Sequence, residues 1–266
     1  MAITDTSRFI HTIQSDVLSP NFYTEVLRNT EKNLCFTHRD EVAKELSPMI
    51  EKVISESEQY FVFRSREGIL GKDLELKQAF LEAFPTGSCV VDWLVQDVSA
   101  QVNFFSIVSG ENYPFISFRI IIGGEIEKGE AKASRHFHRD SAALTLVCSY
   151  AGPGMEWVAN NNVNREIFEQ RHMQKEGEPD ELFIKDTSQI FQFPTMAVGI
   201  LKGELRPDEK DLSAKAFTQD LMGLKFDVPF NIGKGLIHRG PPQPKDKKRL
   251  IVTVSSFTVP QGFVGE

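Results

Sequence analysis

The stretch Pro114-Phe-Ile-Ser-Phe-Arg-Ile-Ile-Ile-Gly123 marks the point at which the pattern of the chain changes. β-branched and aromatic residues fill it and a glycine ends it, so it predicts a strand. Short strands separated by glycine and proline turns are typical of a β-sandwich or jelly roll. Seven more such strands are expected after it, at residues 135–140, 143–150, 155–159, 190–193, 196–202, 235–238 and 249–259.

The residues before this stretch are mostly of a helical pattern. Apolar side chains recur there at spacings of three and four residues, which is the helical period. The segments with this pattern are 20–27, 37–54, 72–84 and 89–107. We therefore expect an α+β protein in which residues 1–110 form a helical N-terminal region that packs on a β domain of residues 111–266.

Two segments interrupt the expected strands. Residues 160–186 are polar, with a run of asparagines and several charges, and residues 205–233 are mixed in composition. The part from Leu212 to Leu224 could be helical. Long insertions on a β scaffold often serve as lids or binding loops, so both are expected near the entrance of a site.

Composition excludes several classes of function. The 266 residues carry 30 Lys and Arg against 37 Asp and Glu, which gives a formal net charge of −7. A net acidic chain with no basic block is a poor binder of nucleic acid. No apolar run approaches the roughly 18 residues needed to span a bilayer, so no membrane association is expected.

The cysteines and the first residues indicate a compartment. Cys35, Cys89 and Cys148 are an odd number with no paired spacing, so a disulfide framework or a cysteine-based zinc site is not expected. The chain starts without a basic segment followed by an apolar one, the pattern of a secretory signal. These features predict reduced thiols and a cytoplasmic location.

The sequence Arg135-His-Phe-His-Arg-Asp140 concentrates side chains that bind metals. Side chains alternate between faces along a strand, so His136, His138 and Asp140 would share one face. Two imidazoles and a carboxylate are costly to bury unless something pairs with them. A divalent metal ion is one such partner.

A third histidine lies near the other end of the chain. His238 falls within Gly235-Leu-Ile-His-Arg-Gly-Pro-Pro242, just before a turn. Eleven residues later, Arg249 begins the apolar strand that runs to Phe257. An arginine at that place suggests an anionic partner, because its planar fork matches a carboxylate.

Taken together, the His138-x-Asp140 pair, the distal His238 and Arg249 resemble the iron(II)/2-oxoglutarate-dependent dioxygenase superfamily. The resemblance implies a double-stranded β-helix, which is a jelly roll. It implies that His138, Asp140 and His238 are the catalytic ligands of Fe(II), in a facial triad that leaves positions open. It further implies that Arg249 binds the far carboxylate of 2-oxoglutarate, and that a small-molecule or peptide substrate is hydroxylated.

The chain departs from that superfamily beside the expected arginine. Many members have Ser or Thr two residues after it, where this chain has Ile251. Thr253 and Ser255 lie further along the same face of the expected strand and could substitute. Tyr150 or Thr145, on the strand after the His-x-Asp pair, could bond a carboxylate of the cofactor. We take Arg249, Tyr150 and Thr253 as the expected cofactor-binding residues.

A second resemblance is to a bacterial domain family of unknown function. It covers roughly the last 150 residues and implies no activity. The matching pieces are Phe137–Asp140, Leu146–Trp157, Pro194–Glu204 and His238–Pro242.

Three other interpretations remain open. His136 could replace His138 in a His-x-His site of the cupin kind, although Ala142 stands where those sites have glutamate. The protein could be a metal enzyme of the cupin kind that uses no 2-oxoglutarate. It could also be a non-enzymatic metal-binding or sensor module on the same fold, with zinc or nickel bound.

Phenylalanine is unusually frequent, with 21 residues against 4 Tyr and 2 Trp. Its ring has no polar handle, so most of these side chains should be buried. We expect some of the rings to line a metal-bearing cavity inside the β domain. The sequence carries no signal for the oligomeric state.

Overall fold

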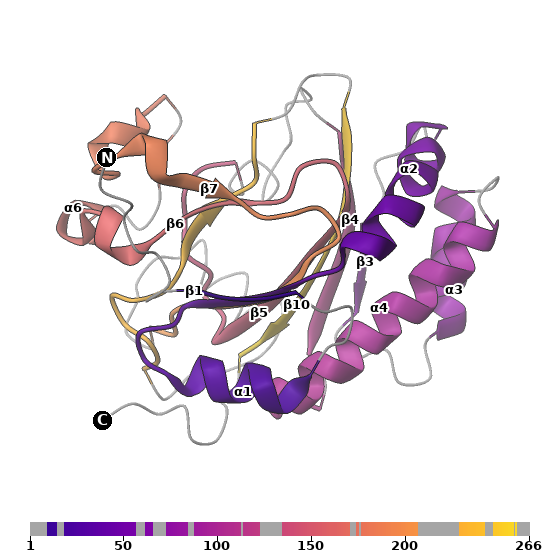
Figure 1. Cartoon of the computed structure of the whole chain (residues 1–266), viewed down its shortest axis with the longest axis horizontal. Coiled ribbons are helices and arrows are strands. Elements are labelled where there is room, and N and C mark those ends of the chain that lie inside the picture. The colour runs from indigo at the N-terminus through magenta and orange to yellow at the C-terminus, as the bar shows by residue number, and fades with distance from the viewer. Residues whose placement is uncertain are drawn as a thin grey trace.

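Two β-sheets and a layer of helices make up the computed structural model of the chain (Figure 1). The residues that it describes are 10–14, 19–56, 62–65, 73–84, 88–112, 114–122, 135–170, 174–175, 177–206, 229–242, 247–257 and 259. The major sheet has the strand order β1-β2-β8-β5-β10-β4-β3, and the minor sheet has the order β7-β6-β9. The expected α+β class is confirmed.

Most strand pairs are antiparallel, and the β1–β2 pair is parallel. The strands of the major sheet are β1 (Ile10–Gln14), β2 (Leu34–His38), β3 (Val62–Ser65), β4 (Phe115–Ile122), β5 (Leu144–Ala151), β8 (Val198–Lys202) and β10 (Lys248–Ser256). Those of the minor sheet are β6 (Glu156–Val158), β7 (Ile190–Gln192) and β9 (Ile237–Arg239). Every strand expected from residue 114 onward forms, except the one at 135–140.

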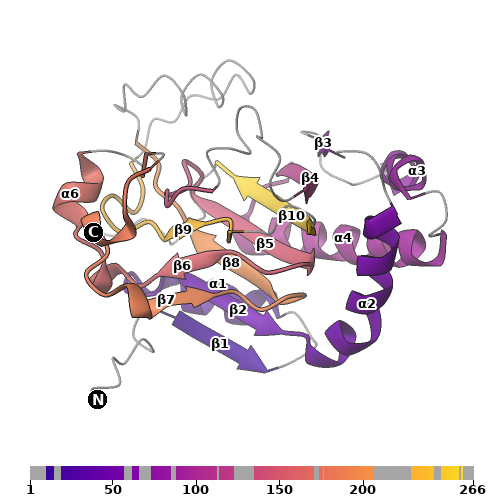
Figure 2. The same ribbon diagram turned by 90° about the horizontal axis from the view of Figure 1, so that it is seen from above.

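The four helices expected in the first 110 residues also form. They cover one face of the major sheet, and the minor sheet lies over the other face (Figures 1 and 2). They are α1 (Pro20–Arg28), α2 (Asp40–Glu56), α3 (Asp73–Ala83) and α4 (Ser88–Ser109).

The same region also supplies strands that the sequence pattern did not predict. Strands β1 and β2 extend one edge of the major sheet, and β3 forms its other edge. These strands have only four or five residues, so they carry little periodicity of their own. A purely helical N-terminal layer is therefore not confirmed, and the boundary near residue 110 stays a prediction.

The major sheet separates two apolar cores. Alternate residues of β5 and β10 pack against the helices, among them Leu146 and Val252. The residues between them face the minor sheet, where Val147 and Ile251 join a second cluster that includes Trp157. Phenylalanines occur in both cores. The core between the helices and the major sheet includes Phe80, Phe84, Phe104, Phe105 and Phe118. The core between the two sheets includes Phe36 and Phe193.

The segment 160–186 is more structured than its polar composition suggests. It contains α6 (Arg165–Glu169) and two short 3-10 helices, η2 (Asn160–Asn162) and η3 (Asp180–Leu182). A third 3-10 helix, η4 (Thr187–Gln189), follows it. The segment has its own apolar cluster, which includes Phe168 and Phe183 and continues into the minor sheet. The helix expected at 212–224 lies outside the described residues.

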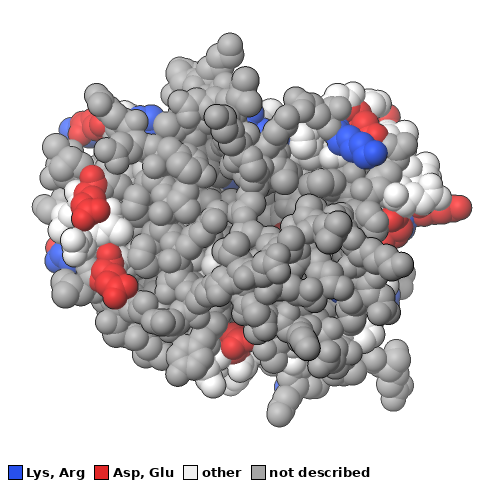
Figure 3. Space-filling model, turned by 180° about the vertical axis from the view of Figure 1, so that it is seen from behind, with Lys and Arg blue, Asp and Glu red and all other residues white. Residues whose placement is uncertain are grey.

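The described charged side chains are scattered on the face seen in Figure 3. Neither Lys and Arg nor Asp and Glu gather there into one patch among the residues that the structure describes. None of the described helices combines the length and the apolar character that crossing a membrane requires.

Candidate metal centre

Backbone hydrogen bonds place His138 directly opposite His238. Each residue donates its N–H to the carbonyl of the other at 2.9 Å, and the two form an isolated antiparallel bridge. The continuous strand expected at 135–140 is therefore wrong. Its residues are bonded elsewhere: Phe137 exchanges hydrogen bonds with Gln174, and the carbonyl of Asp140 accepts from the backbone of Glu204 at 2.9 Å.

Three potential metal ligands converge at this bridge. The Nε2 atoms of His138 and His238 lie 3.7 and 3.5 Å from Oδ1 of Asp140. One ligand atom from each of the three lies within 4.8 Å of the other two. The two nitrogen–oxygen distances are too long for hydrogen bonds. They leave a gap of the size that an ion with ligands at about 2.0–2.2 Å would fill after small side-chain movements.

The other nitrogen of each ring fixes the tautomer. Nδ1 of His138 lies 2.7 Å from the carbonyl oxygen of His136, and Nδ1 of His238 lies 3.2 Å from that of Leu236. A carbonyl oxygen only accepts, so each Nδ1 carries a proton, and in the neutral ring Nε2 is then the nitrogen whose lone pair is turned toward Asp140. Metal-binding histidines are oriented in this way by partners behind them.

His136 does not belong to the group of three. Within the described residues, the cluster with metal-ligand spacing contains His138, Asp140 and His238, and His136 contributes only its backbone carbonyl to that cluster.

The arginine after each histidine is paired with acidic residues. Arg139 lies 3.0 Å from Glu204, and Arg239 bonds to Glu156 at 2.7 Å and Asp180 at 2.9 Å. The guanidinium of Arg239 also lies over the ring of Phe137, 4.2 Å from its centroid. These contacts fix the backbone next to each histidine.

An aromatic row continues from the histidines across the minor sheet. Trp157 pairs with His238 on one side and with Phe191 on the other. The rings of Trp157 and Phe191 are stacked, with centroids 4.7 Å apart. Trp157 is buried and belongs to the core between the sheets. The sequence pattern gave no indication that this tryptophan lies beside the candidate ligand His238.

Arg249 lies on β10 and is 3% exposed. It shares a face with Ile251 and Thr253, because alternate residues of a strand point the same way. Ile251 belongs to the core between the sheets, so this face is turned toward the minor sheet. Gly152 lies so close that a Cβ there would be 2.7 Å from Cγ of Arg249.

Two buried hydroxyl groups lie on the same side of the neighbouring strand β5. Thr145 and Ser149 are 5% and 0% exposed, and neither hydroxyl has a hydrogen-bond partner among the described residues. Ser149 is opposite Ile251 in the β5–β10 register, and Thr145 is opposite Ser255. A buried hydroxyl without a partner is unusual and calls for an explanation such as an absent ligand.

Tyr150 lies on the opposite face of the sheet, against α4. Its hydroxyl donates to Asp97 at 2.7 Å and accepts from Gln101 at 2.8 Å. Burial, followed by the charge of Asp97, raises the pKa of Tyr150 well above its usual value. The structure therefore does not bring Tyr150 to the face that carries Arg249. Thr253 does lie on that face, and its hydroxyl is 3.4 Å from the carbonyl of Ser117.

Comparison with known proteins gives a family. The model of DUF1826, described as a protein of unknown function, matches residues 22–254. The chain belongs to the DUF1826 family. This confirms the resemblance to a domain family of unknown function and extends it into the N-terminal half. No curated protein matches the sequence of this DUF1826 chain significantly.

Several solved structures align with the DUF1826 chain. Dioxygenase for auxin oxidation 1 from Arabidopsis thaliana, as a binary complex with 2-oxoglutarate, aligns at 12% identity over 97% of this chain and 98% of its own, with a TM-score of 0.45. The rice dioxygenase for auxin oxidation aligns at 10% identity over 96% and 88%, with a TM-score of 0.44. A full-length protein of Neurospora crassa, crystallised in complex with alpha-KG, aligns at 12% identity over 100% and 92%, with a TM-score of 0.39.

Some residues around the site of this DUF1826 protein had no expected role. Ser149 could not be recognised from the sequence, because only strand pairing places it opposite Ile251, on the face of the sheet that carries Arg249. The sequence pattern assigned no role to Glu204 or Arg165, although Glu204 is 1% exposed. The one available signal was that Glu204 ends the Pro194–Glu204 piece shared with the domain family.

Proposed function

We propose that this DUF1826 protein is a non-haem iron(II)- and 2-oxoglutarate-dependent oxygenase built on a double-stranded β-helix. The observation that carries the proposal is the convergence of two imidazole Nε2 atoms on one carboxylate oxygen. A set of two histidines and one carboxylate is the donor set of non-haem Fe(II) oxygenases, and it leaves coordination positions for other ligands. His138, Asp140 and His238 would hold the ion.

The face of the major sheet that is turned toward the minor sheet carries side chains that suit 2-oxoglutarate. Arg249 supplies a buried guanidinium, which suits a carboxylate bidentately. The unpartnered hydroxyls of Ser149 and Thr145 face the same side. They supply the hydrogen-bond donors that Ile251 cannot. Thr253 remains in the proposed set, and Tyr150 is left out because its hydroxyl is bonded on the other face.

The residues of the chain would divide the work as follows. Iron held there would supply the activation of oxygen, with 2-oxoglutarate as the two-electron reductant. His138 and His238 orient their lone pairs through their Nδ1 bonds, and Asp140 offsets part of the ion's charge. Arg249 holds the far carboxylate of the cofactor. The apolar core around Trp157 keeps water from the reacting groups.

The test is whether 2-oxoglutarate binds in a metal-dependent way. Thermal unfolding is followed with Mn(II) alone, with 2-oxoglutarate alone and with both, Mn(II) being used because it does not react with oxygen under these conditions. We expect 2-oxoglutarate to raise Tm only when Mn(II) is present, and the effect to disappear in Asp140→Ala and Arg249→Ala. If Mn(II) raises Tm but 2-oxoglutarate gives no further rise, the result would instead favour the metal-binding or sensor module.

A further inference from the structure

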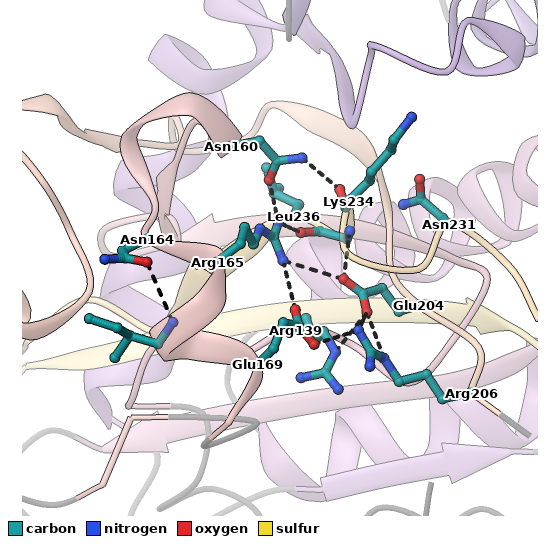
Figure 4. Close-up of polar contacts among 12 residues, drawn as sticks. Arg139, Asn160, Asn164, Arg165, Glu169, Glu204, Arg206, Asn231, Lys234 and Leu236 are labelled. Carbon is teal, nitrogen blue, oxygen red and sulfur yellow. Dashed lines mark hydrogen bonds and ion pairs between the residues drawn. The ribbon is translucent and has the colours of Figure 1, made fainter. Parts of the chain in front are cut away.

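Glu204 follows β8 and is the most deeply buried acidic residue that the structure describes, at 1% exposure. Its carboxylate accepts from three arginines and one backbone N–H (Figure 4). Oε2 lies 3.0 Å from Nε of Arg139 and 2.8 Å from Nε of Arg206. Oε1 lies 3.3 Å from Arg165 and accepts from the backbone N–H of Gly235 at 2.9 Å.

Two of these donors come from the segments that carry the metal ligands. Arg139 lies between two of the three ligands in the sequence, and Gly235 precedes His238 by three residues. Glu204 thus links, through one carboxylate, both halves of the candidate metal centre. Chain segments that are almost 100 residues apart in the sequence meet on this side chain.

The backbone around Glu204 makes the same connection. The N–H of Glu204 donates to the carbonyl of Asp140 at 2.9 Å, and the N–H of Leu236 donates to the carbonyl of Lys202 at 2.9 Å. The side chain also packs tightly against Gly235, where a Cβ would lie 2.6 Å from Cγ of Glu204. The absence of a side chain at Gly235 therefore lets the carboxylate reach its backbone N–H.

The charge of Glu204 is needed by the arginines around it. Glu169 is the other carboxylate of this cluster, and it pairs with Arg206 at 2.5 Å and with Arg165 at 3.6 Å. Three guanidinium groups thus share two carboxylates. Burial lowers the pKa of Arg165, which shows the cost of keeping this charge away from water. A neutral residue at 204 would remove the Glu204 charge from Arg139, which lies beside other cations.

We propose that Glu204 is a positioning residue of the metal centre. It acts through Arg139 and Gly235 to keep Asp140 and His238 at the spacing that a metal ion requires. The inference rests on the proposed function, because it assumes that the three ligands bind a metal. Partners behind metal ligands typically change metal affinity by 10- to 100-fold when they are replaced.

The test compares Co(II) binding by the wild type with that by Glu204→Gln and Asp97→Asn. The visible d–d bands of Co(II) report the ligand geometry, and titration gives Kd. Asp97 is the matched control, because it too is a largely buried carboxylate bonded to an arginine, Arg39, at 2.7 Å, but on the helix side of the major sheet. Thermal unfolding of each protein without metal measures the purely structural effect.

We expect Glu204→Gln to bind Co(II) at least about tenfold more weakly, with altered d–d bands, and Asp97→Asn to match the wild type in both. Affinity and bands of Glu204→Gln equal to those of the wild type would overturn the inference alone. A wild type that binds no Co(II) would overturn the proposed function along with it. Gly235→Ala gives a second variant that keeps every charge but displaces the carboxylate, and the same change in bands is expected there. Unchanged bands in Gly235→Ala would also count against the inference.

Discussion

His138 and His238 exchange two backbone hydrogen bonds of 2.9 Å across an isolated bridge, and both Nε2 atoms are turned toward Asp140. The bridge fixes the backbone of the two rings, and each Nδ1 bond to a carbonyl fixes the ring itself. The geometry of the three candidate ligands is therefore set by the fold itself. Such preorganisation is what makes a two-histidine, one-carboxylate set an effective metal site.

Asp140→Ala should remove metal binding and leave the fold intact. The side chain of Asp140 is partly exposed, so its loss removes little apolar packing. At a Co(II) concentration about 100 times Kd, the free energy of unfolding of the wild type should rise by about 2.7 kcal/mol. Denaturant titration should show no such rise in the variant. Asp92→Ala, which removes a half-exposed carboxylate on α4, should respond to Co(II) as the wild type does.

Ser149→Ala should stabilise the protein and weaken its binding of 2-oxoglutarate. Removing a buried hydroxyl that has no partner among the described residues should raise the free energy of unfolding by about 1 kcal/mol. Losing one donor to the cofactor should raise its Kd in the presence of Mn(II) by roughly 3- to 10-fold. Calorimetry and denaturant titration measure the two effects separately.

The contrasting variant is Tyr150→Phe, on the next residue of the same strand. It removes one hydrogen-bond partner each from Asp97 and Gln101, so it should lower the free energy of unfolding by about 1–3 kcal/mol. Its affinity for 2-oxoglutarate should stay at the wild-type value. The reverse pattern is weaker cofactor binding in Tyr150→Phe and unchanged binding in Ser149→Ala. It would contradict the account, because it would place the cofactor on the face of the sheet that is covered by the helices.

Gly152→Ala should displace the side chain of Arg249 without affecting the candidate metal ligands. Gly152 has φ of +73°, and its new Cβ would lie 2.7 Å from Cγ of Arg249. We expect binding of 2-oxoglutarate to weaken at least about tenfold, since the guanidinium must shift from its fork geometry, while Kd for Mn(II) is retained. Gly177→Ala is the control: its φ is +82° and nothing lies within 4 Å. It introduces the same backbone strain but should bind the cofactor normally.

Lys202 should make the stability of the protein depend on pH in the alkaline range. Burial, and then the charge of Lys234, lowers the pKa of Lys202 from 10.5 to about 8 in the folded chain. Between these two values the unfolded chain holds the proton and the folded chain does not, so unfolding takes up a proton and becomes less favourable as pH rises. The free energy of unfolding should therefore increase from pH 8 to pH 10.5.

Lys202→Met should abolish that increase. At pH 7 it should also stabilise the protein by up to about 3 kcal/mol, less the contribution of the hydrogen bond from Lys202 to the carbonyl of Asn29 at 2.8 Å. Denaturant titrations at about pH 7 and about pH 9.5, on either side of the folded-state pKa, give both quantities. An alkaline slope that persists in the variant would assign the effect to another group.

The sequence pattern identified the three candidate metal ligands but not the way in which they meet. His138, Asp140 and His238 could be chosen by residue type and spacing, and alternation along β5 and β10 separated the two faces of the sheet. Alternation alone does not show which face of the sheet is turned toward the helices. Tyr150 and Thr145 were therefore equally good candidates for binding the cofactor. Only the packing of α4 on the sheet distinguishes them.

Strand pairing and tertiary contacts account for what the sequence did not reveal. Strands β1, β2 and β3 are too short to show a period, and they form because the sheet offers them an edge. Glu204 is recognisable only through partners that lie up to 65 residues before it and 31 residues after it in the chain. An acidic residue surrounded by three arginines is a tertiary arrangement, and no local pattern encodes it.

The central claim is that one site holds both iron(II) and 2-oxoglutarate. The most direct measurement adds Fe(II) and then 2-oxoglutarate to the protein without oxygen and records the visible absorption spectrum. A charge-transfer band from the metal to the chelating oxo-acid should appear for the wild type and for Tyr150→Phe, and should be absent from Asp140→Ala. A wild-type spectrum with no such band, at concentrations where Fe(II) is bound, would contradict the account.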